Sequence, residues 1–412
     1  MLPDINIPIK ERIIDSAINV IATVGMHRTT HRKIAQAAGI SLSSTTYYYE
    51  TKEDIFRDAV SRVLYTYLGL FQQTVEAARF DAASVDPIAL IIELISNAAE
   101  RDRDLDHAWA EIILASARTD EGQDLALAWF SDMDDAWIDL AEIGGLNSDA
   151  TAIQCLLDVT CGLVFMTLSL GLDRSQVLSV IQGADPIETW HLAAAPRRPA
   201  PEQKGRRNGA QTREKLIDTA VDLLLEGGTG ALTYQAVAER GGVALTAPSY
   251  HFGRLSNLLN AAEARLFEWS KLRYREGLAL HGARIASRSA LIDTTTAILI
   301  REATEYSAAT IAHYSIWSEA ARDTLLRPMV AEAILDQTQA WQKQLSRMTP
   351  TNINVALACE AFFIGWLIRA TSTGAPLDML ATARSRFDLV FETLTKSGTI
   401  EAFFRTLLQK SK

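Results

Sequence analysis

The chain has 412 residues, 48% of them hydrophobic, and carries a formal net charge of −10. That length gives room for two or more domains with sizeable buried cores. No apolar run follows the N-terminal MLPDINIPIKER, so a secretory signal is not expected. The cysteines, Cys155, Cys161 and Cys359, lack metal-ligand spacing with histidine, and they fit a reduced, cytoplasmic interior better than disulfides or a metal site.

The negative charge is unevenly distributed. Residues 1–60 hold seven Lys and Arg against seven Asp and Glu, and residues 197–255 hold nine against six. These segments are therefore at 0 and +3, and the remaining residues carry −13. Without a strong basic stripe, non-specific binding of these segments to DNA is expected to be modest and salt-sensitive.

The first predicted elements, from Ile9 to Phe56, recur without a gap as Thr212 to Leu259. The offset is 203 throughout, and it pairs Ala17 with Ala220, Gly25 with Gly228, Thr30 with Thr233, Gly39 with Gly242 and Tyr47 with Tyr250. A constant register over nearly fifty residues indicates a duplication.

Each repeat has the pattern of a helix-turn-helix. In the first, apolar residues at steps of three and four predict a helix that Gly25 ends. Thr30 can cap a short second helix, Gly39 makes a tight turn, and Ser41 stands where a third helix would begin. The N-terminal end of that third helix exposes short polar and aromatic side chains, and this end meets base edges in such motifs.

This stretch resembles the DNA-binding domain of TetR-type transcriptional regulators. The matching motifs are Thr29-Thr30, Ile34-Ala35, Ala38-Gly39, Tyr47-Tyr48-Tyr49 and Lys52-Glu53 in the first repeat, and Leu232-Thr233, Val237-Ala238, Gly241-Gly242-Val243 and Tyr250-His251-Phe252 in the second. The first departs from the family at Thr46, where tyrosine is usual. The second has Leu255 in place of lysine, which puts one phosphate contact in doubt.

The rest of the chain also reads as helical. One long helix is predicted from Lys52 to about Arg79, and further helical stretches over 88–117, 124–143, 151–170 and 173–195. Residues 193–210, AAAPRRPAPEQKGRRNGA, read as a linker. A second long helix is predicted from Leu258 to about Ser287. Trp137 and Arg118 align with Trp341 and Arg322 at an offset of 204, so the bodies repeat as well.

The apolar stretches Thr151–Leu170 and Asn354–Thr371 have nearly the length of membrane spans. However, Asp158 interrupts the first and Arg369 the second, which disfavours insertion. We expect instead that the two helices pack on each other, with Gly162 and Gly365 at their closest approach.

The side chains expected at DNA come from both repeats. In the first, Leu42, Ser43 and Ser44 are candidates for base edges, and the phosphate candidates are Thr30, Thr46, Tyr47, Tyr48 and Lys52; in the second the set is Thr233, Leu245, Thr246, Ala247, Ser249, Tyr250 and His251. No Arg, Asn or Gln occupies a position that is expected to face the base edges. Contacts with thymine methyl groups and the shape of the DNA would therefore carry much of the sequence specificity. Tyr49 and Phe252 are expected to pack inside the heads instead. Arg206 and Arg207 could contact phosphate or simply be solvated.

The family resemblance implies an effector cavity within each body. The weak candidates for its lining are His107, Trp109 and Glu111 in the first body and His313, Tyr314 and Trp317 in the second, each of which is as readily explained as core or surface. No nucleophile–base pair, phosphate loop, cofactor motif or metal set stands out, so an enzyme is not expected.

We therefore expect an all-α chain of two TetR-like units that form an intramolecular pseudo-dimer. The expected parts are a first head (1–54), a first body (55–192), a linker (193–210), a second head (211–257) and a second body (258–412). The expected function is a cytoplasmic repressor that leaves an approximately palindromic operator when a small molecule binds. Two alternatives stay open: an effector-independent DNA-organising or interaction protein, and a regulator in which only the first head reads DNA.

Overall fold

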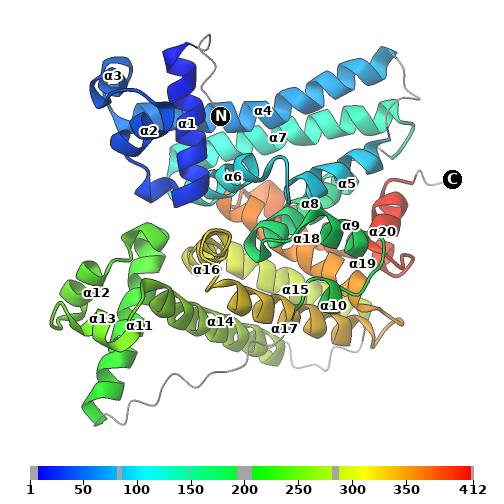
Figure 1. Cartoon of the computed structure of the whole chain (residues 1–412). Coiled ribbons are helices and arrows are strands. Elements are labelled where there is room, and N and C mark those ends of the chain that lie inside the picture. Colours follow the sequence, from blue (N-terminus) through cyan, green and yellow to red (C-terminus); the bar gives the residue numbers. More distant parts are fainter. Residues whose placement is uncertain (1–7, 81–85, 148, 193–206, 281–286, 410–412) are drawn as a thin grey trace.

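The computed structural model describes residues 8–80, 86–147, 149–192, 207–280 and 287–409, and every regular element in these ranges is a helix (Figure 1). The first half comprises α1 (Ile9–Val24), η1 (Met26–Arg28), α2 (His31–Ala38), α3 (Leu42–Tyr48), α4 (Lys52–Phe80), α5 (Pro87–Asn97), α6 (Arg103–Ser116), α7 (Asp120–Ile143), α8 (Ala150–Leu170), α9 (Arg174–Ile181) and α10 (Pro186–Thr189).

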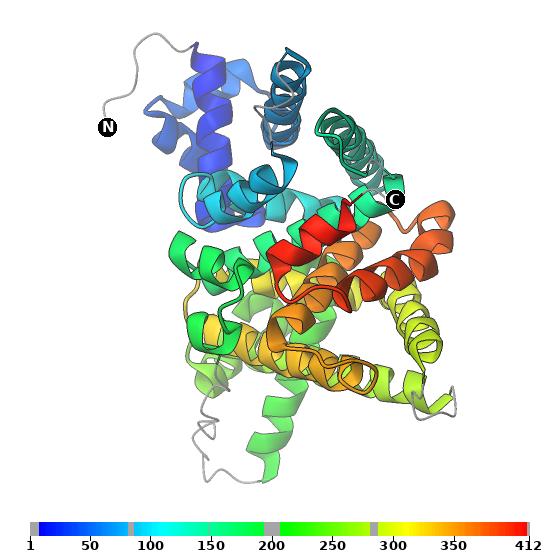
Figure 2. The same cartoon turned by 90° about the vertical axis from the view of Figure 1, so that its right-hand side faces the viewer.

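The second half repeats this order. It comprises α11 (Arg207–Gly227), η3 (Gly228–Ala231), α12 (Tyr234–Gly241), α13 (Ala247–Phe252), α14 (Leu255–Leu280), α15 (Arg288–Ala303), α16 (Ser307–Ala320), α17 (Arg327–Leu345), α18 (Ile353–Ser372), α19 (Leu377–Leu394) and α20 (Ile400–Leu407). In Figure 1 the two heads project from the left side of the molecule as separate lobes, and Figure 2 shows the side on which the helices of the bodies lie.

Two predicted boundaries need correction. The second long helix begins at Leu255 and is described to Leu280, whereas Ser287 caps α15 by accepting from Ala290 N. The linker was expected to reach residue 210, but α11 already begins at Arg207. Residues 193–206, which include Arg206, lie outside the described residues. The stretch 88–117 is mostly helical, as predicted, and consists of α5 and α6 with a turn after Asn97 between them.

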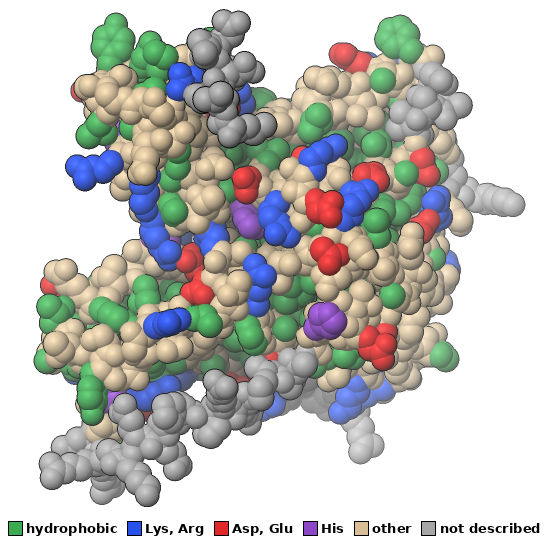
Figure 3. All heavy atoms as spheres, in the orientation of Figure 1, with side chains coloured by type: hydrophobic (Ala, Val, Ile, Leu, Met, Phe, Trp, Pro, Cys, Tyr) green, Lys and Arg blue, Asp and Glu red, His purple; other side chains and the backbone are tan. Residues whose placement is uncertain are grey.

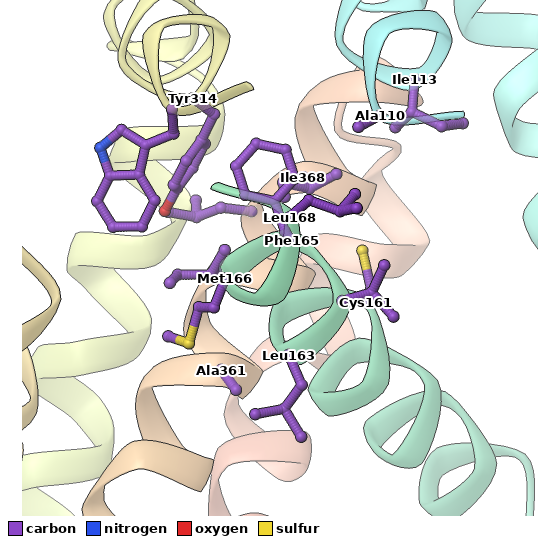
Figure 4. Packing of buried hydrophobic residues seen from close by; sticks show 14 of the residues in the cluster. Ala110, Ile113, Cys161, Leu163, Phe165, Met166, Leu168, Tyr314, Ala361 and Ile368 are labelled. Atoms are coloured by element: carbon purple, nitrogen blue, oxygen red, sulfur yellow. The ribbon is translucent and has the colours of Figure 1, made fainter. Parts of the chain in front are cut away.

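The core of the molecule is the crossing of α8 and α18, which pack on each other as expected. Both helices are apolar on all sides, as buried helices are. A methyl group on Gly162 would overlap the carbonyl of Ala361, and one on Gly365 would overlap the carbonyl oxygen of Asp158. The two glycines therefore permit a backbone approach that no other residue would allow. Figure 4 shows neighbouring side chains, with Phe165 of α8 beside Tyr314 of α16.

Length and composition alone would allow α8 and α18 to cross a membrane, but 89% of the apolar window of each is buried inside the protein. The polar residues that interrupt them form a buried charge network. Arg369 of α18 donates to Asp158 of α8 at 2.6 Å and to Asp134 of α7 at 2.8 Å. Arg386 of α19 contacts Asp158 at 3.3 Å. The first half supplies both carboxylates and the second both guanidiniums, so the charges balance across the interface.

Candidate nucleic-acid interface and body cavity

The helix-turn-helix of the first head is held by local capping contacts. Gly25 ends α1 with a φ of 84°, and Gly39 ends α2 with a φ of 64°, both in the left-handed region that favours glycine. Thr30 accepts from Lys33 N at the start of α2, and Ser41 accepts from Ser44 N at the start of α3. These are the caps and turns that the sequence predicts.

The exposed face of α3 carries the predicted contact residues. Tyr47 is 83% exposed, Leu42 44% and Tyr48 40%, whereas Tyr49 is 5% exposed and its hydroxyl donates to Asp58 at 2.7 Å. Large side chains normally bury such surface, so Tyr47 is available to a partner while Tyr49 packs the head. The Ser41 hydroxyl lies 2.8 Å from that of Ser43.

Of the remaining candidate DNA contacts in the first head, some side chains already make contacts within the head. The Thr46 hydroxyl donates to the carbonyl of Ser43 at 3.1 Å, which leaves its lone pairs available. Lys52 is half-buried, with its Nζ 4.9 Å from the centre of the Phe56 ring. Its ammonium is therefore positioned by an aromatic face at the first turn of α4. Thr30 is exposed at the cap of α2.

The second head has the same elements with a shorter third helix. Thr233 caps α12 through Ala236 N, and Gly242 ends it with a φ of 57°. The helix α13 begins only at Ala247, so Leu245 and Thr246 lie in the preceding turn and Thr246 makes no side-chain cap. The position equivalent to Ser41 is Ala244, which has no oxygen to cap an earlier start, and Pro248 occupies the first turn.

Despite this difference, the exposed set of the second head resembles that of the first. Tyr250 is 71% exposed and Leu245 62%, whereas Phe252 is 6% exposed under the guanidinium of Arg213. Ser249 is exposed and donates to the carbonyl of Thr246 at 3.0 Å, and His251 is half-buried beside Tyr250. No lysine follows, because Leu255 begins α14.

Residues 13–59 match the family model described as bacterial regulatory proteins, tetR family. The match covers α1 to the start of α4, the helix-turn-helix just described, and it indicates a DNA-binding transcriptional regulator. Among solved structures, a member of the TetR family from Streptomyces coelicolor A3 is 23% identical, with 44% of this chain and 98% of that one covered and a TM-score of 0.36. The multidrug binding protein EbrR, complexed with imidazole, is 23% identical, with coverages of 47% and 96% and a TM-score of 0.37. No curated protein matches the chain.

Behind the TetR-like head, the first body contains a partly enclosed cavity of about 60 Å³. Its walls come from α4, α5, α6, α7 and α8, and one arginine reaches it from α18. The lining is mostly apolar and aromatic, with these polar or aromatic members: Tyr67, Asp106, Trp109, Trp129, Phe130, Thr160 and Arg369. Pockets of this composition are typical of sites for small organic molecules.

Only Trp109 of the six proposed effector residues lies in this lining. Glu111 and His107 share α6 with it but point elsewhere. Glu111 Oε2 accepts from Met26 N of the head at 3.1 Å, and Glu111 Oε1 accepts from Arg322 of α16 at 2.6 Å. Burial raises the pKa of the Glu111 carboxyl, but the Arg322 guanidinium and these hydrogen bonds outweigh it, so the pKa is lowered. Burial, with help from Arg322, lowers the pKa of His107 to about 4.

The three candidates of the second body pack together as core. Trp317 is fully buried, and its Nε1 donates to Glu263 at 3.0 Å. His313 Nδ1 lies 2.7 Å from the same carboxylate, and Tyr314 is in edge contact with Trp317. The polar groups of Trp317 and His313 therefore already have a partner within the second body.

Two aligned arginines link each body to the opposite head. Arg118 donates to the carbonyl of Glu226 at 3.3 Å, at the end of α11, and Arg322 lies against Gly25, at the end of α1. The surroundings differ, because Arg322 also pairs with Glu319 at 2.9 Å, and Glu319 pairs with Arg28 of the first head at 2.5 Å. Of these contacts with the opposite half, the first head thus has ion pairs and the second has carbonyl hydrogen bonds.

Sequence reasoning missed most of the cavity and all of these links. Tyr67, Trp129 and Phe130 read only as apolar helix positions, which any core would use. One signal was present, since Arg369 interrupts a helix whose only other charged residue is Glu360. A buried arginine must find anionic partners, and this one finds them beside a cavity.

Proposed function

We propose that the chain is a DNA-binding repressor in which one chain supplies both heads of a pseudo-dimer and a small molecule in the first body lowers its affinity for DNA. Two-fold regulators of this kind place a recognition helix on each of two half-sites. Supporting this, Tyr47 and Tyr250 are the most exposed of the large hydrophobic side chains in their heads, and both heads project from the same side of the molecule (Figure 1). Figure 3 shows Lys and Arg side chains along the recess between the heads.

The observation that carries the proposed release is the double role of α6. This helix lines the cavity through Asp106 and Trp109, and it bonds to the first head and to the second body through Glu111. It also packs directly on α1. A ligand that widens the cavity displaces α6, and the displacement reaches the end of α1 through Glu111 and Met26. The ligand must bind the displaced state better than the docked state for release to follow.

Two heads on one face of DNA need about 34–36 Å between their centres. A shift of a few ångströms at one head is therefore enough to spoil simultaneous docking. The first head is the one bonded to Glu111, so we expect it to move more than the second when the cavity is filled.

The decisive test is DNA binding by variants of the exposed tyrosines. A selected operator is titrated in gel shifts with the parent and with Tyr47→Ala combined with Lys52→Ala. We expect weaker binding across all sequences and a salt slope smaller by about one, since one phosphate contact by a charged group is lost. Tyr65→Ala is the matched control, because Tyr65 is 66% exposed on α4, outside the helix-turn-helix. Unchanged binding by the double variant would refute the assignment of the head.

A second candidate, in which only the first head reads DNA, is favoured by the short uncapped α13 and by Leu255. Tyr250→Ala separates the two. In a two-headed regulator it weakens binding to a full operator, whereas in a one-headed regulator it changes nothing. An effector-independent DNA-organising protein would instead bind DNA equally with and without every small molecule tested.

A further inference from the structure

Two residues that line the cavity in the first body carry hydrogen-bond donors that no described residue uses. Trp109 Nε1 and Arg369 Nη2 are buried without a hydrogen-bond partner in the part of the chain that the structure describes. Both side chains line the cavity, and they are 5% and 2% exposed. Buried donors in native proteins nearly always have an acceptor, so this pair marks a place where a ligand oxygen would be stabilised.

The other walls of the cavity are suited to a flat apolar group. Trp109 and Trp129 have ring centres 6.1 Å apart, and Trp129 and Phe130 have theirs 4.9 Å apart. Trp129 already donates its Nε1 to the carbonyl of Leu64 at 3.1 Å, so it offers only its ring. Aromatic rings pack well against such edge and tilted arrangements.

The charges around the cavity select an uncharged ligand. Asp134 and Asp158 are both paired with Arg369, so neither carboxylate is free for a ligand cation. Asp106 accepts from the Tyr67 hydroxyl, and burial raises the pKa of Asp106 to about 8, so near neutral pH this carboxyl is mostly protonated. A cation would therefore meet a guanidinium without a free carboxylate. An anion would upset the balance of charge that Arg369 already has with its two partners.

We infer that this cavity binds an uncharged aromatic compound whose carbonyl-type oxygen accepts from Trp109 Nε1 and Arg369 Nη2. That such a ligand lowers the affinity of the chain for DNA rests on the proposed function. Because Arg369 belongs to α18, the ligand contacts both halves of the chain at once. The cavity of about 60 Å³ is smaller than the ~150 Å³ that holds benzene in an engineered protein core, so binding must widen it.

The test uses three probes of one shape: acetophenone, isopropylbenzene and protonated 1-phenylethylamine. They share the ring and the branched side chain and differ in carrying an acceptor, no polar group or a positive charge. Binding to the full chain is measured by calorimetry without DNA, up to the solubility of each probe. We expect acetophenone to bind at least about tenfold more tightly than isopropylbenzene, as a hydrogen bond from a charged donor typically gives, and the amine to bind most weakly.

Two tryptophan variants then test whether Trp109 Nε1 causes the difference in affinity between acetophenone and isopropylbenzene. Trp109→Phe keeps an aromatic ring and removes the N–H, so the preference for acetophenone should shrink several-fold while isopropylbenzene binds as before. Trp129→Phe is the control, because its N–H is already used by Leu64, and the preference should stay as in the parent. Equal binding of acetophenone and isopropylbenzene, tighter binding of the amine, or no binding of any probe would each overturn the inference.

The same titrations repeated with operator DNA keep the two proposals apart. If acetophenone shows the expected pattern but leaves DNA affinity unchanged, the ligand class stands and the release mechanism fails. If DNA binding depends on Tyr47 but the probes show no preference, the regulator stands and the ligand class fails.

Discussion

Asp106 is a buried acid whose environment gives the protein a measurable pH dependence. Burial raises its pKa from the ordinary 3.8 to about 8, against a hydrogen bond from Tyr67 that lowers it. The folded state therefore holds this proton where the unfolded state has lost it, and stability falls as pH rises between these two values. The loss is at most about 1.4 kcal/mol per pH unit.

Asp106→Asn removes this titration while keeping the shape of the side chain. We expect the free energy of unfolding of the parent, relative to the variant, to fall steadily from pH 5 to pH 8 in urea titrations. The comparison with the variant cancels other groups such as His107, whose lowered pKa acts in the opposite direction. A difference that does not change with pH would show that Asp106 is ionised in the fold.

At this scale, the sequence predicted the local chemistry of the head well. The capping by Thr30 and Ser41, the exposure of Tyr47 and the burial of Tyr49 all follow from short-range patterns, and the structure confirms them. The pairing of Glu111 with Arg322 and of Arg369 with Asp134 could not be predicted, because each pair is more than 200 residues apart in the chain.

Among the elements, the crossing of α8 and α18 is the most demanding contact. Gly365→Ala places a methyl group on the carbonyl oxygen of Asp158, which is backbone and cannot turn away. The helices must separate, so we expect a loss of about 3 kcal/mol or more in the free energy of unfolding, measured by urea titration.

The matched control is Gly69→Ala on α4, where a methyl group meets nothing within 4 Å. Alanine favours a helix more than glycine does, so this variant should gain about 0.5–1 kcal/mol. If Gly365→Ala were equally harmless, the close approach of the two helices would be wrong.

The order of helices was largely predictable from periodicity and from the duplicated register. The start of α13 was not, because the second head lacks the capping serine and the chain turns through Leu245 and Thr246 before the helix begins. The start of α14 was also misplaced by three residues, since an apolar pattern does not fix the first turn of a helix.

For the whole molecule, the complementary buried charges bear on assembly. Asp134 and Asp158 come from the first half, and Arg369 and Arg386 from the second. Two first halves or two second halves facing each other would each bury unpaired like charges, which is strongly unfavourable. We therefore expect the halves of one chain to pair with each other.

Light scattering should accordingly give a mass near 45.3 kDa, one chain, at micromolar concentration. A mass of two chains, with the interface of α8 and α18 formed between different chains, would contradict this. Association on a long operator, where two such molecules bind side by side, is compatible with a single chain in solution.

The same asymmetry sets the stoichiometry of the ligand. In the first body Trp109 and Arg369 line a cavity and carry unpartnered donors, whereas in the aligned region of the second body Trp317 and His313 both contact Glu263. The two sites cannot be equivalent, so we expect calorimetry to show one tightly bound ligand molecule per chain, with any compound that lowers DNA affinity.

The two heads differ as well, because α13 is shorter than α3. Selection from random DNA should therefore return operators that are only approximately palindromic. Two equal ligand sites per chain, or a strict preference for perfect palindromes, would mean that the halves act as identical units despite their different side chains.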